Sequence, residues 1–275
     1  MSDPFEDHVC VITGAGSGIG RATALLLAGQ RARLHLVDIR IDHVESVRQE
    51  AHNHGCRHAV SHVLDCADAE AVQALAADVL QEEGRVDLLQ NGVGVIVAGP
   101  VERLTLEEWR RVVDLNLWSV VHGVQAFVPR MLEQGGRRSH VVNIASVAGL
   151  IGFPYCAAYS ATKAAVVGLS ESLTAELHRR NVSVTCVCPG MVRTGLLADG
   201  SLELPGRFGE QLRWFHDHLA PSPKTTARAI LRAVRLDRPL IAPLSGFEGA
   251  WWLKRASAGL YNRLARQLVR LAPGG

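Results

Sequence analysis

The sequence predicts an α/β fold in which helices cover both faces of a parallel β-sheet. Short β-branched runs alternate with longer helical patterns from the N-terminus to about residue 190, as in repeated strand–helix units. The runs are apolar throughout, which is typical of strands buried on both sides. With 275 residues, 48% of them hydrophobic, the chain can bury a large core without disulfides or metals.

Six strands and five helices are expected in alternation along this part of the chain. The strands are predicted at residues 8–13, 33–38, 57–64, 86–90, 140–144 and 182–188. The helical patterns begin near Ile19, Asp42, Asp68, Thr105 and Ala157, several of them at a capping Asp or Thr. Thr105 and Glu108 have the spacing of a capping box, so a long helix is expected to run from there towards Met131.

The pattern loosens after Pro189. Residues 195–223 read as an irregular stretch with one short helix at 210–218, and loops of this length usually act as lids or binding loops. A helix at 225–234, a short strand at 240–242 and a basic amphipathic tail at 247–272 follow. Because no repeat or linker divides the chain, we expect one domain over 1–275, with its core at about 8–245 and a substrate loop at 191–224.

Charge and cysteine content narrow the class of protein. The formal net charge is only +2, so no global field favours nucleic acid or an anionic membrane as a partner. The six cysteines lack both CxxC spacing and the density of a secreted scaffold, which favours reduced thiols. Without a signal-peptide pattern or a run long enough to span a bilayer, the protein is expected to be soluble and cytoplasmic.

A glycine-rich turn follows the first predicted strand and opens the first predicted helix. Its sequence, TGAGSGIG, starts at Thr13, and this context is the one that a dinucleotide site in a doubly wound, Rossmann-type fold requires. Glycines let the backbone amides approach a pyrophosphate at the positive end of the helix. The alternative is an ordinary strand-to-helix turn. The residues expected to bind the cofactor here are Gly14, Ser17, Gly18, Ile19 and Gly20.

Asp38 ends the second predicted strand, about 20 residues beyond the glycines. A carboxylate there can accept hydrogen bonds from the adenosine ribose and repels a 2′-phosphate, so NAD is favoured over NADP as the cofactor. Ile39 stands where a phosphate-reading site would place an arginine, whereas Arg33 and Arg40 keep NADP as the less favoured option. The alternative role for Asp38 is that of a helix cap.

Tyr159 and Lys163 are four residues apart in an Ala-rich helical stretch, so they are expected to share one helix face. A phenol ordinarily loses its proton near pH ~10, and an adjacent ammonium is expected to lower that pKa. The spacing therefore suits a proton-transfer group, although a surface helix can carry the same pair by chance. Ser146 follows the fifth strand, where a hydroxyl can donate to a substrate oxygen or cap its own turn.

Together these motifs resemble the classical short-chain dehydrogenase/reductase family, over residues 9 to about 194. The family's TGxxxGxG turn is matched by Thr13, Gly14, Gly18 and Gly20, and its YxxxK pair by Tyr159 and Lys163. Its NNAG motif appears here as Asn91-Gly92-Val93-Gly94, with Asn91 and Gly94 kept and a glycine in place of the second asparagine. The resemblance implies that Gly92 removes a side chain that supports the central sheet and the cofactor.

The resemblance also implies the roles of individual residues. Ser146, Tyr159 and Lys163 would be catalytic, and Asn116 would hold a water molecule in the proton relay. Asp65 would contact the adenine, and Thr194 with the backbone after Pro189 would hold the nicotinamide amide. Lys163 would also bind the nicotinamide ribose. The further residues implied in cofactor binding are Asn91, Gly92, Tyr159, Pro189 and Val192.

The function expected from this combination is that of an NAD-dependent oxidoreductase acting on CH–OH groups. It would interconvert a secondary alcohol and a ketone, or an aldehyde, with Tyr159 as the general acid and base. The alternatives are a non-redox NAD-dependent epimerase or lyase, and a nucleotide-sensing regulatory protein on the same fold. The partner is expected to be a small-molecule alcohol or ketone, and the family resemblance implies a homodimer or homotetramer.

Three further features concern metal binding, core packing and the substrate. His52, His54, His58 and His62 lack the spacing of metal ligands, so no metal site is expected. Cys186 and Cys188 alternate along a strand and are expected to pack in the core. The basic tail is expected to cover the substrate pocket or a subunit interface, a membrane surface being less favoured, and with the Leu-rich loop it favours a bulky apolar substrate.

Overall fold

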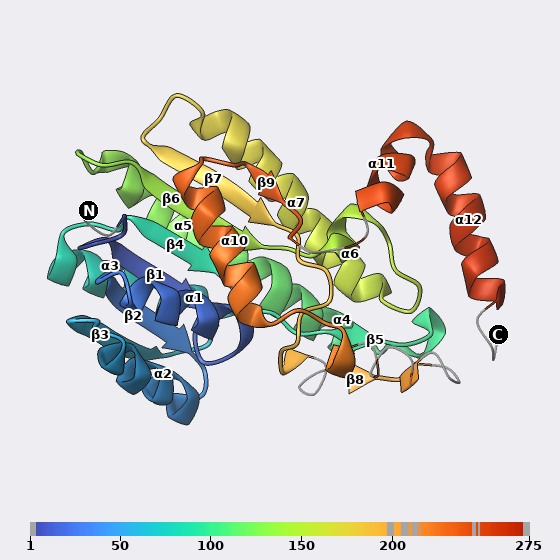
Figure 1. Ribbon diagram of the computed structural model, residues 1–275, viewed down its shortest axis with the longest axis horizontal. Helices are drawn as coiled ribbons and strands as arrows, with labels where there is room; N and C mark the ends of the chain where they lie inside the picture. The colour runs from blue at the N-terminus through green and yellow to red at the C-terminus, as the bar shows by residue number, and fades with distance from the viewer. Residues whose placement is uncertain are drawn as a thin grey trace.

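The structure, a computed structural model, describes residues 4–196, 201–204, 209–210, 214, 216–243, 246 and 248–271. Its centre is a parallel sheet of seven strands in the order β3-β2-β1-β4-β6-β7-β9 (Figure 1). The six strands predicted from the sequence are all present, with ends displaced by at most two residues. They are β1 Val9–Thr13, β2 Arg33–Asp38, β3 His58–Val63, β4 Leu88–Asn91, β6 Ser139–Ile144 and β7 Val182–Val187, and β9 Leu240–Ile241 is the short apolar strand expected after them.

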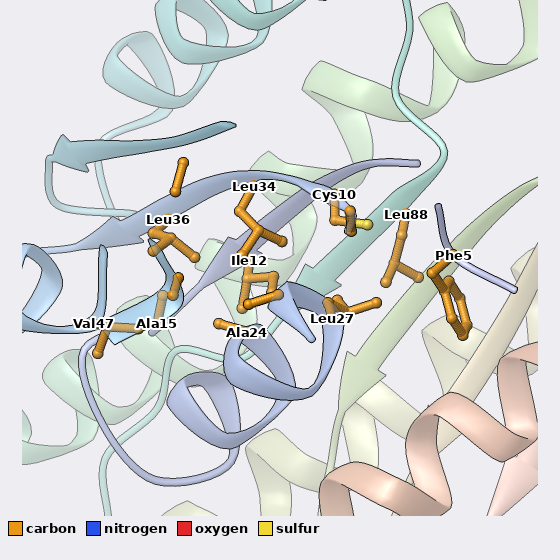
Figure 2. Close-up of a cluster of buried hydrophobic side chains, with 14 of the residues drawn as sticks. Phe5, Cys10, Ile12, Ala15, Ala24, Leu27, Leu34, Leu36, Val47 and Leu88 are labelled. Atoms are coloured by element: carbon orange, nitrogen blue, oxygen red, sulfur yellow. The ribbon is translucent and has the colours of Figure 1, made fainter. Parts of the chain in front are cut away.

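Helices cover both faces of the sheet, which confirms the predicted fold class. Alternate residues of β1 face opposite ways, so Cys10 and Ile12 pack on one side while Val9 and Val11 pack on the other. On the first side lie α1 Gly18–Ala28, α2 Ile41–Asn53 and α10 Pro223–Arg235. Figure 2 shows side chains of α1 and α2 packed against those of β1 and β2. On the second side lie α3 Ala69–Glu83, α5 Ser119–Glu133 and α7 Ala157–Leu177.

The order of the strands reverses direction between β1 and β4. Strands β2 and β3 follow β1 on one side of the sheet, whereas β4, β6, β7 and β9 extend on the other. Loops that leave the carboxyl ends of β1 and β4 therefore diverge, and ligands of open α/β sheets bind in the crevice between such loops. The glycine-rich turn after β1 and the Asn91-Gly92 sequence at the end of β4 meet at this point.

The long helix expected after Thr105 is present, but one wide turn interrupts it. Thr105 and Glu108 form the capping box at the start of α4 Leu106–Val113, with bonds of 3.2 and 2.9 Å between each side chain and the other residue's amide. A π-helical turn at Asp114–Trp118 connects α4 to α5. Such turns occur at functional sites in many helices, and this one contains Asn116.

The short elements that were not predicted include the 3-10 helix η1 Val101–Arg103, two strands and a four-residue helix. Strand β5 Val97–Ala98 pairs with β8 Ser201–Leu202, which lies inside the expected substrate loop. Two-residue strands are too short to show an alternating pattern, and the four-residue helix α6 Val147–Leu150 is too short to show a helical one. The helix expected at 210–218 includes residues 211–213 and 215, which lie outside the described residues.

The basic tail forms two helices, α11 Glu248–Ala256 and α12 Ala258–Leu271, and α12 projects from the body of the molecule (Figure 1). The tail contacts α6 and the segment after it through two hydrogen bonds. Lys254 Nζ on α11 donates to the Leu150 carbonyl at 2.7 Å, and the Tyr261 hydroxyl on α12 donates to the Gly152 carbonyl at 3.1 Å. Within the described part of the chain, every helix is too short or too polar to cross a membrane.

Helix α5 packs against β4 at a glycine. A β-carbon at Gly123 would overlap the side-chain oxygen of Asn91, which is held in place by its own buried hydrogen bond. We therefore expect Gly123→Ala to destabilise the protein by about 1–3 kcal/mol. The matched control is Gly168→Ala on the exposed face of α7, where a β-carbon meets no atom within 4 Å. This change should stabilise the protein by about 0.4–1 kcal/mol. Urea unfolding of both variants measures the difference, and equal midpoints would contradict the assigned packing.

Candidate active site

A cavity of about 590 Å³ opens at the carboxyl ends of β1, β4, β6 and β7. It brings together predicted site residues that are up to 180 positions apart in the chain, from Gly14 to Thr194. The predicted residues that line it are Gly14, Ser17, Gly18, Ile19, Gly20, Asp38, Asp65, Gly92, Ser146, Tyr159, Lys163, Pro189, Val192 and Thr194. Two predicted residues, Asn91 and Asn116, do not line it.

The glycine-rich turn makes one wall, and its glycines are needed for conformation and for space. Gly14 and Gly18 have φ angles of 67° and 54°, a region that favours glycine. A β-carbon at Gly20 would overlap the carbonyl oxygen of Gly14, and one at Gly14 would lie 2.9 Å from that of Gly92. The glycines therefore let the backbone at the start of α1 border the cavity.

Asp38 holds this turn from the end of β2. One carboxylate oxygen accepts from the Gly16 amide at 2.9 Å and the other from the Arg40 amide at 3.1 Å. The side chain is buried, and a carboxylate has lone pairs beyond the two that these bonds use. Of the two arginines weighed as phosphate readers, Arg33 is bound to Glu83 at 2.6 and 2.9 Å, whereas Arg40 lines the cavity.

The change in the NNAG motif is accommodated by close packing. The Gly92 amide donates to Thr13 Oγ1 at 3.0 Å, and a β-carbon at Gly92 would lie 2.6 Å from the Thr13 carbonyl oxygen. A side chain at this position does not fit the arrangement. The ends of β1 and β4 are therefore joined by the Thr13–Gly92 contact, in the place where the resemblance implied a supporting asparagine side chain.

Ser146 and Tyr159 meet inside the cavity. Ser146 follows β6 and caps α6, because its hydroxyl accepts from the Ala148 amide at 3.1 Å. Both roles considered for Ser146 are therefore compatible, since it caps its turn and also faces the cavity. Burial raises the pKa of Tyr159 to about 12, and a hydrogen bond with Ser146 opposes that shift without cancelling it.

Lys163 lies one helical turn after Tyr159, on the same buried face of α7. Its Nζ donates to the Ile144 carbonyl at 2.9 Å and lies 5.8 Å from the centre of the Tyr159 ring. Burial lowers the pKa of Lys163 to about 8. The pKa of Tyr159 is thus raised by burial, whereas the sequence predicted that a neighbouring ammonium would lower it. The loss of hydration disfavours the charged form of both groups.

The two predicted residues outside the cavity make buried hydrogen bonds instead. Asn116 Oδ1 accepts from the Val95 amide at 2.7 Å, and Nδ2 donates to the Val95 carbonyl at 2.9 Å and to Thr162 Oγ1 at 3.2 Å. Asn91 Nδ2 donates to Asn143 Oδ1 at 2.9 Å. In this structure Asn116 therefore positions the loop after β4 against α7, and Asn91 connects β4 to β6.

Sequence reasoning missed an apolar group on the cavity wall and one cation. Except for Val93, which lies within the NNAG-like sequence, these positions belong to no motif, so only their meeting in space identifies them. The apolar side chains include Ile39, Leu64, Val93, Val95, Leu115 and Leu196, and the cation is Arg111 on α4. The cavity wall contains no described residue of α11 or α12, so the expectation that the tail covers the pocket is not met within this chain.

Comparisons with known proteins agree with this geometry. The family described as short chain dehydrogenase matches residues 8–203. The putative oxidoreductase SadH of Mycobacterium tuberculosis is 40% identical over 84% of this chain and 83% of its own. The cyclohexanol dehydrogenase of an Acinetobacter species is 36% identical over 72% of this chain and 78% of its own.

A solved structure agrees over nearly the full length. It is a short chain dehydrogenase/reductase from Burkholderia phymatum, in complex with NAD, with 30% identity and a TM-score of 0.86. The alignment covers 94% of this chain and 96% of that one. The family matches most of this chain, and the glycine-rich turn and the buried Tyr159–Lys163 pair border one cavity. This chain therefore belongs to the short-chain dehydrogenase/reductase family.

Proposed function

We propose that this protein is an NAD-dependent oxidoreductase that interconverts a secondary alcohol and a ketone, or an aldehyde. The observation that carries the proposal is that Ser146, Tyr159 and Lys163 line the same cavity as the glycine-rich turn and Asp38. Groups suited to proton transfer and groups suited to a dinucleotide thus share one site. The relatives named as a cyclohexanol dehydrogenase and as a complex with NAD support the same class of reaction.

The residues around the turn fit a dinucleotide. Backbone amides at the start of α1 suit a pyrophosphate, and the glycines leave the space that it needs. Asp38 retains acceptor capacity for ribose hydroxyls and its charge disfavours a 2′-phosphate, while Asp65 and Thr194 border the same cavity. NAD, when bound, supplies or accepts the hydride.

The chain's own groups handle the proton and the substrate oxygen. Tyr159 takes the hydroxyl proton of the alcohol, or returns it in the reductive direction, at its phenolic oxygen. Ser146 donates to the substrate oxygen while negative charge develops on it. A phenolate in a buried site needs a neighbouring cation, and protonated Lys163 supplies that charge. Asn116 positions the segment after β4, in which a β-carbon at Gly94 would lie 3.2 Å from Lys163 Nζ.

We propose an apolar substrate, because aliphatic side chains of Val93, Val95, Leu115 and Leu196 surround the site. Net formation of NADH with a hydrophobic alcohol separates this function from an epimerase, a lyase or a nucleotide sensor. All six cysteines are free thiols, which is typical of a reducing compartment, so we place the enzyme in the cytoplasm. Following its family, we propose a homodimer or homotetramer.

Removal of the phenolic oxygen tests the assigned proton transfer. Tyr159→Phe is expected to lower kcat by about 10²–10⁴-fold, because the acid/base group is lost. NAD binding, measured by fluorescence titration, should persist. The control is Tyr261→Phe. The Tyr261 hydroxyl bonds to the Gly152 carbonyl outside the cavity, so its removal should leave kcat unchanged. An absorbance screen for NADH across alcohols provides the rate, and activity that survives in Tyr159→Phe would refute the role.

Neutralisation of Asp38 tests the cofactor choice. Asp38→Asn retains an acceptor for the Gly16 or Arg40 amide but removes the charge that repels a 2′-phosphate. The ratio of kcat/KM with NAD to that with NADP should fall by roughly tenfold or more. Asp42→Asn removes an equal charge from an exposed position outside the cavity wall, and it should leave the ratio near that of the wild type. A wild-type preference for NADP would overturn the assignment.

The buried ammonium predicts a pH dependence of stability. Because burial lowers the Lys163 pKa to about 8, the unfolded chain binds more protons than the folded protein from there up to the ordinary lysine value near ~10.4. The free energy of unfolding should therefore rise with pH through this window. Urea unfolding of the wild type and of Lys163→Met isolates this contribution, since other groups cancel in the difference. A difference that stays flat with pH would show that the ammonium is not disfavoured.

A further inference from the structure

Three imidazoles and two carboxylates converge at the outer edge of the sheet, away from the cavity. His35 lies on β2, His58 and His62 on β3, and Glu82 and Glu83 at the end of α3. His35 pairs in register with Val60, so the residues two positions before and after Val60 face the same side as His35. The four histidines considered in the sequence do not form this cluster as a set. His58 and His62 belong to it, and the third histidine is His35 from the neighbouring strand.

The nitrogen and oxygen atoms of this cluster lie at short range. His58 Nε2 is 3.2 Å from a Glu82 oxygen and 3.0 Å from a Glu83 oxygen, and His35 Nε2 is 3.2 Å from Glu83. One ligand atom each from His35, His58 and Glu82 lie within 4.8 Å of one another. Zinc bonds of ~2.0–2.2 Å to nitrogen and oxygen in a tetrahedral site separate the ligand atoms by roughly 3.3 Å. Glu82, with 46% of its side chain exposed, can rotate to close the remaining gap.

The cluster is short of positive charge and of hydrogen bonds. His58 Nε2 is buried and makes no hydrogen bond, although two carboxylates face it. Arg33 neutralises Glu83 through two bonds. Within the described part of the chain, Glu82 has an ion-pair contact only with His58. A metal ion between His58 and Glu82 would give each of them a partner. A single imidazole proton cannot make good hydrogen bonds to two carboxylates at once.

The surrounding residues suit a ligating His35. His35 Nδ1 lies 3.0 Å from His62 Nε2. If Nε2 of His35 binds the metal, Nδ1–H can donate to His62. Metal-bound histidines generally donate their second N–H to such a neighbouring acceptor.

We propose that His35, His58 and Glu82 bind a divalent transition-metal ion of the zinc class. The ion would join the end of α3 to the edge strand β3 and its neighbour β2, and Glu83 would remain paired with Arg33 beside it. None of the three ligands lines the catalytic cavity, so the site is independent of the proposed reaction. Its effect would be on the stability of this edge of the sheet.

Cobalt titration of the untagged, metal-free full-length protein tests the proposal. We expect one Co²⁺ per chain with the visible d–d absorption of a low-coordinate nitrogen and oxygen site, displaced by Zn²⁺. His58→Asn and Glu82→Gln should each weaken binding by about tenfold or more. The matched control is His54→Asn, an exposed histidine on the neighbouring turn that is 3.8 Å from Glu50. Its Co²⁺ affinity should equal that of the wild type.

Thermal unfolding provides a second readout. Zn²⁺ should raise the unfolding midpoint of the wild type and of His54→Asn, and leave that of Glu82→Gln unchanged. Glu82 is half-exposed at a helix end, so this variant is expected to keep its fold, which circular dichroism verifies. Absence of Co²⁺ binding, equal affinity in all variants, or an intense sulfur-to-cobalt band that assigns the metal to cysteines would overturn the proposal.

Discussion

The close approach of three backbone segments at the ends of β1 and β4 determines the rest of the site. Gly20 contacts the carbonyl of Gly14, Gly14 contacts that of Gly92, and Gly92 lies against Thr13. A side chain at any of these positions would separate the segments. Because they meet, the start of α1 faces the crevice where the strand order reverses, and Asp38 can reach across to the Gly16 amide. The cavity stays open because Gly14, Gly20 and Gly92 carry no side chains.

Burial then sets the chemical state of the groups on the opposite wall. Tyr159 and Lys163 are both buried, and burial disfavours the charged form of each. The phenol therefore loses its proton less easily than usual, and the ammonium loses its proton more easily. A site of this kind responds strongly to any ligand that brings charge, since the low-dielectric surroundings amplify each interaction.

Buried amides connect this site to the core. Asn91 on β4 bonds to Asn143 on β6, and Asn143 Nδ2 donates to Ser170 on α7 at 3.0 Å, so the helix that carries Tyr159 is tied to the sheet by polar contacts. Asn116 makes a comparable link from the π-helical turn to the loop after β4. These links hold the reacting groups through rigid elements, which is what a precise geometry requires.

The sequence by itself determined the alternation of strands and helices, the glycine-rich turn, the capping box at Thr105 and the Tyr159–Lys163 spacing. Each of these depends on residues near one another in the chain, where period, conformation and capping leave a local pattern. The apolar wall, the positions of Asn91 and Asn116 and the cluster of His35 with His58 and Glu82 were decided only by the tertiary structure. Contacts between distant residues, and the loss of hydration that shifts the pKa values of Tyr159 and Lys163, depend on how the elements pack, and no local pattern encodes that packing.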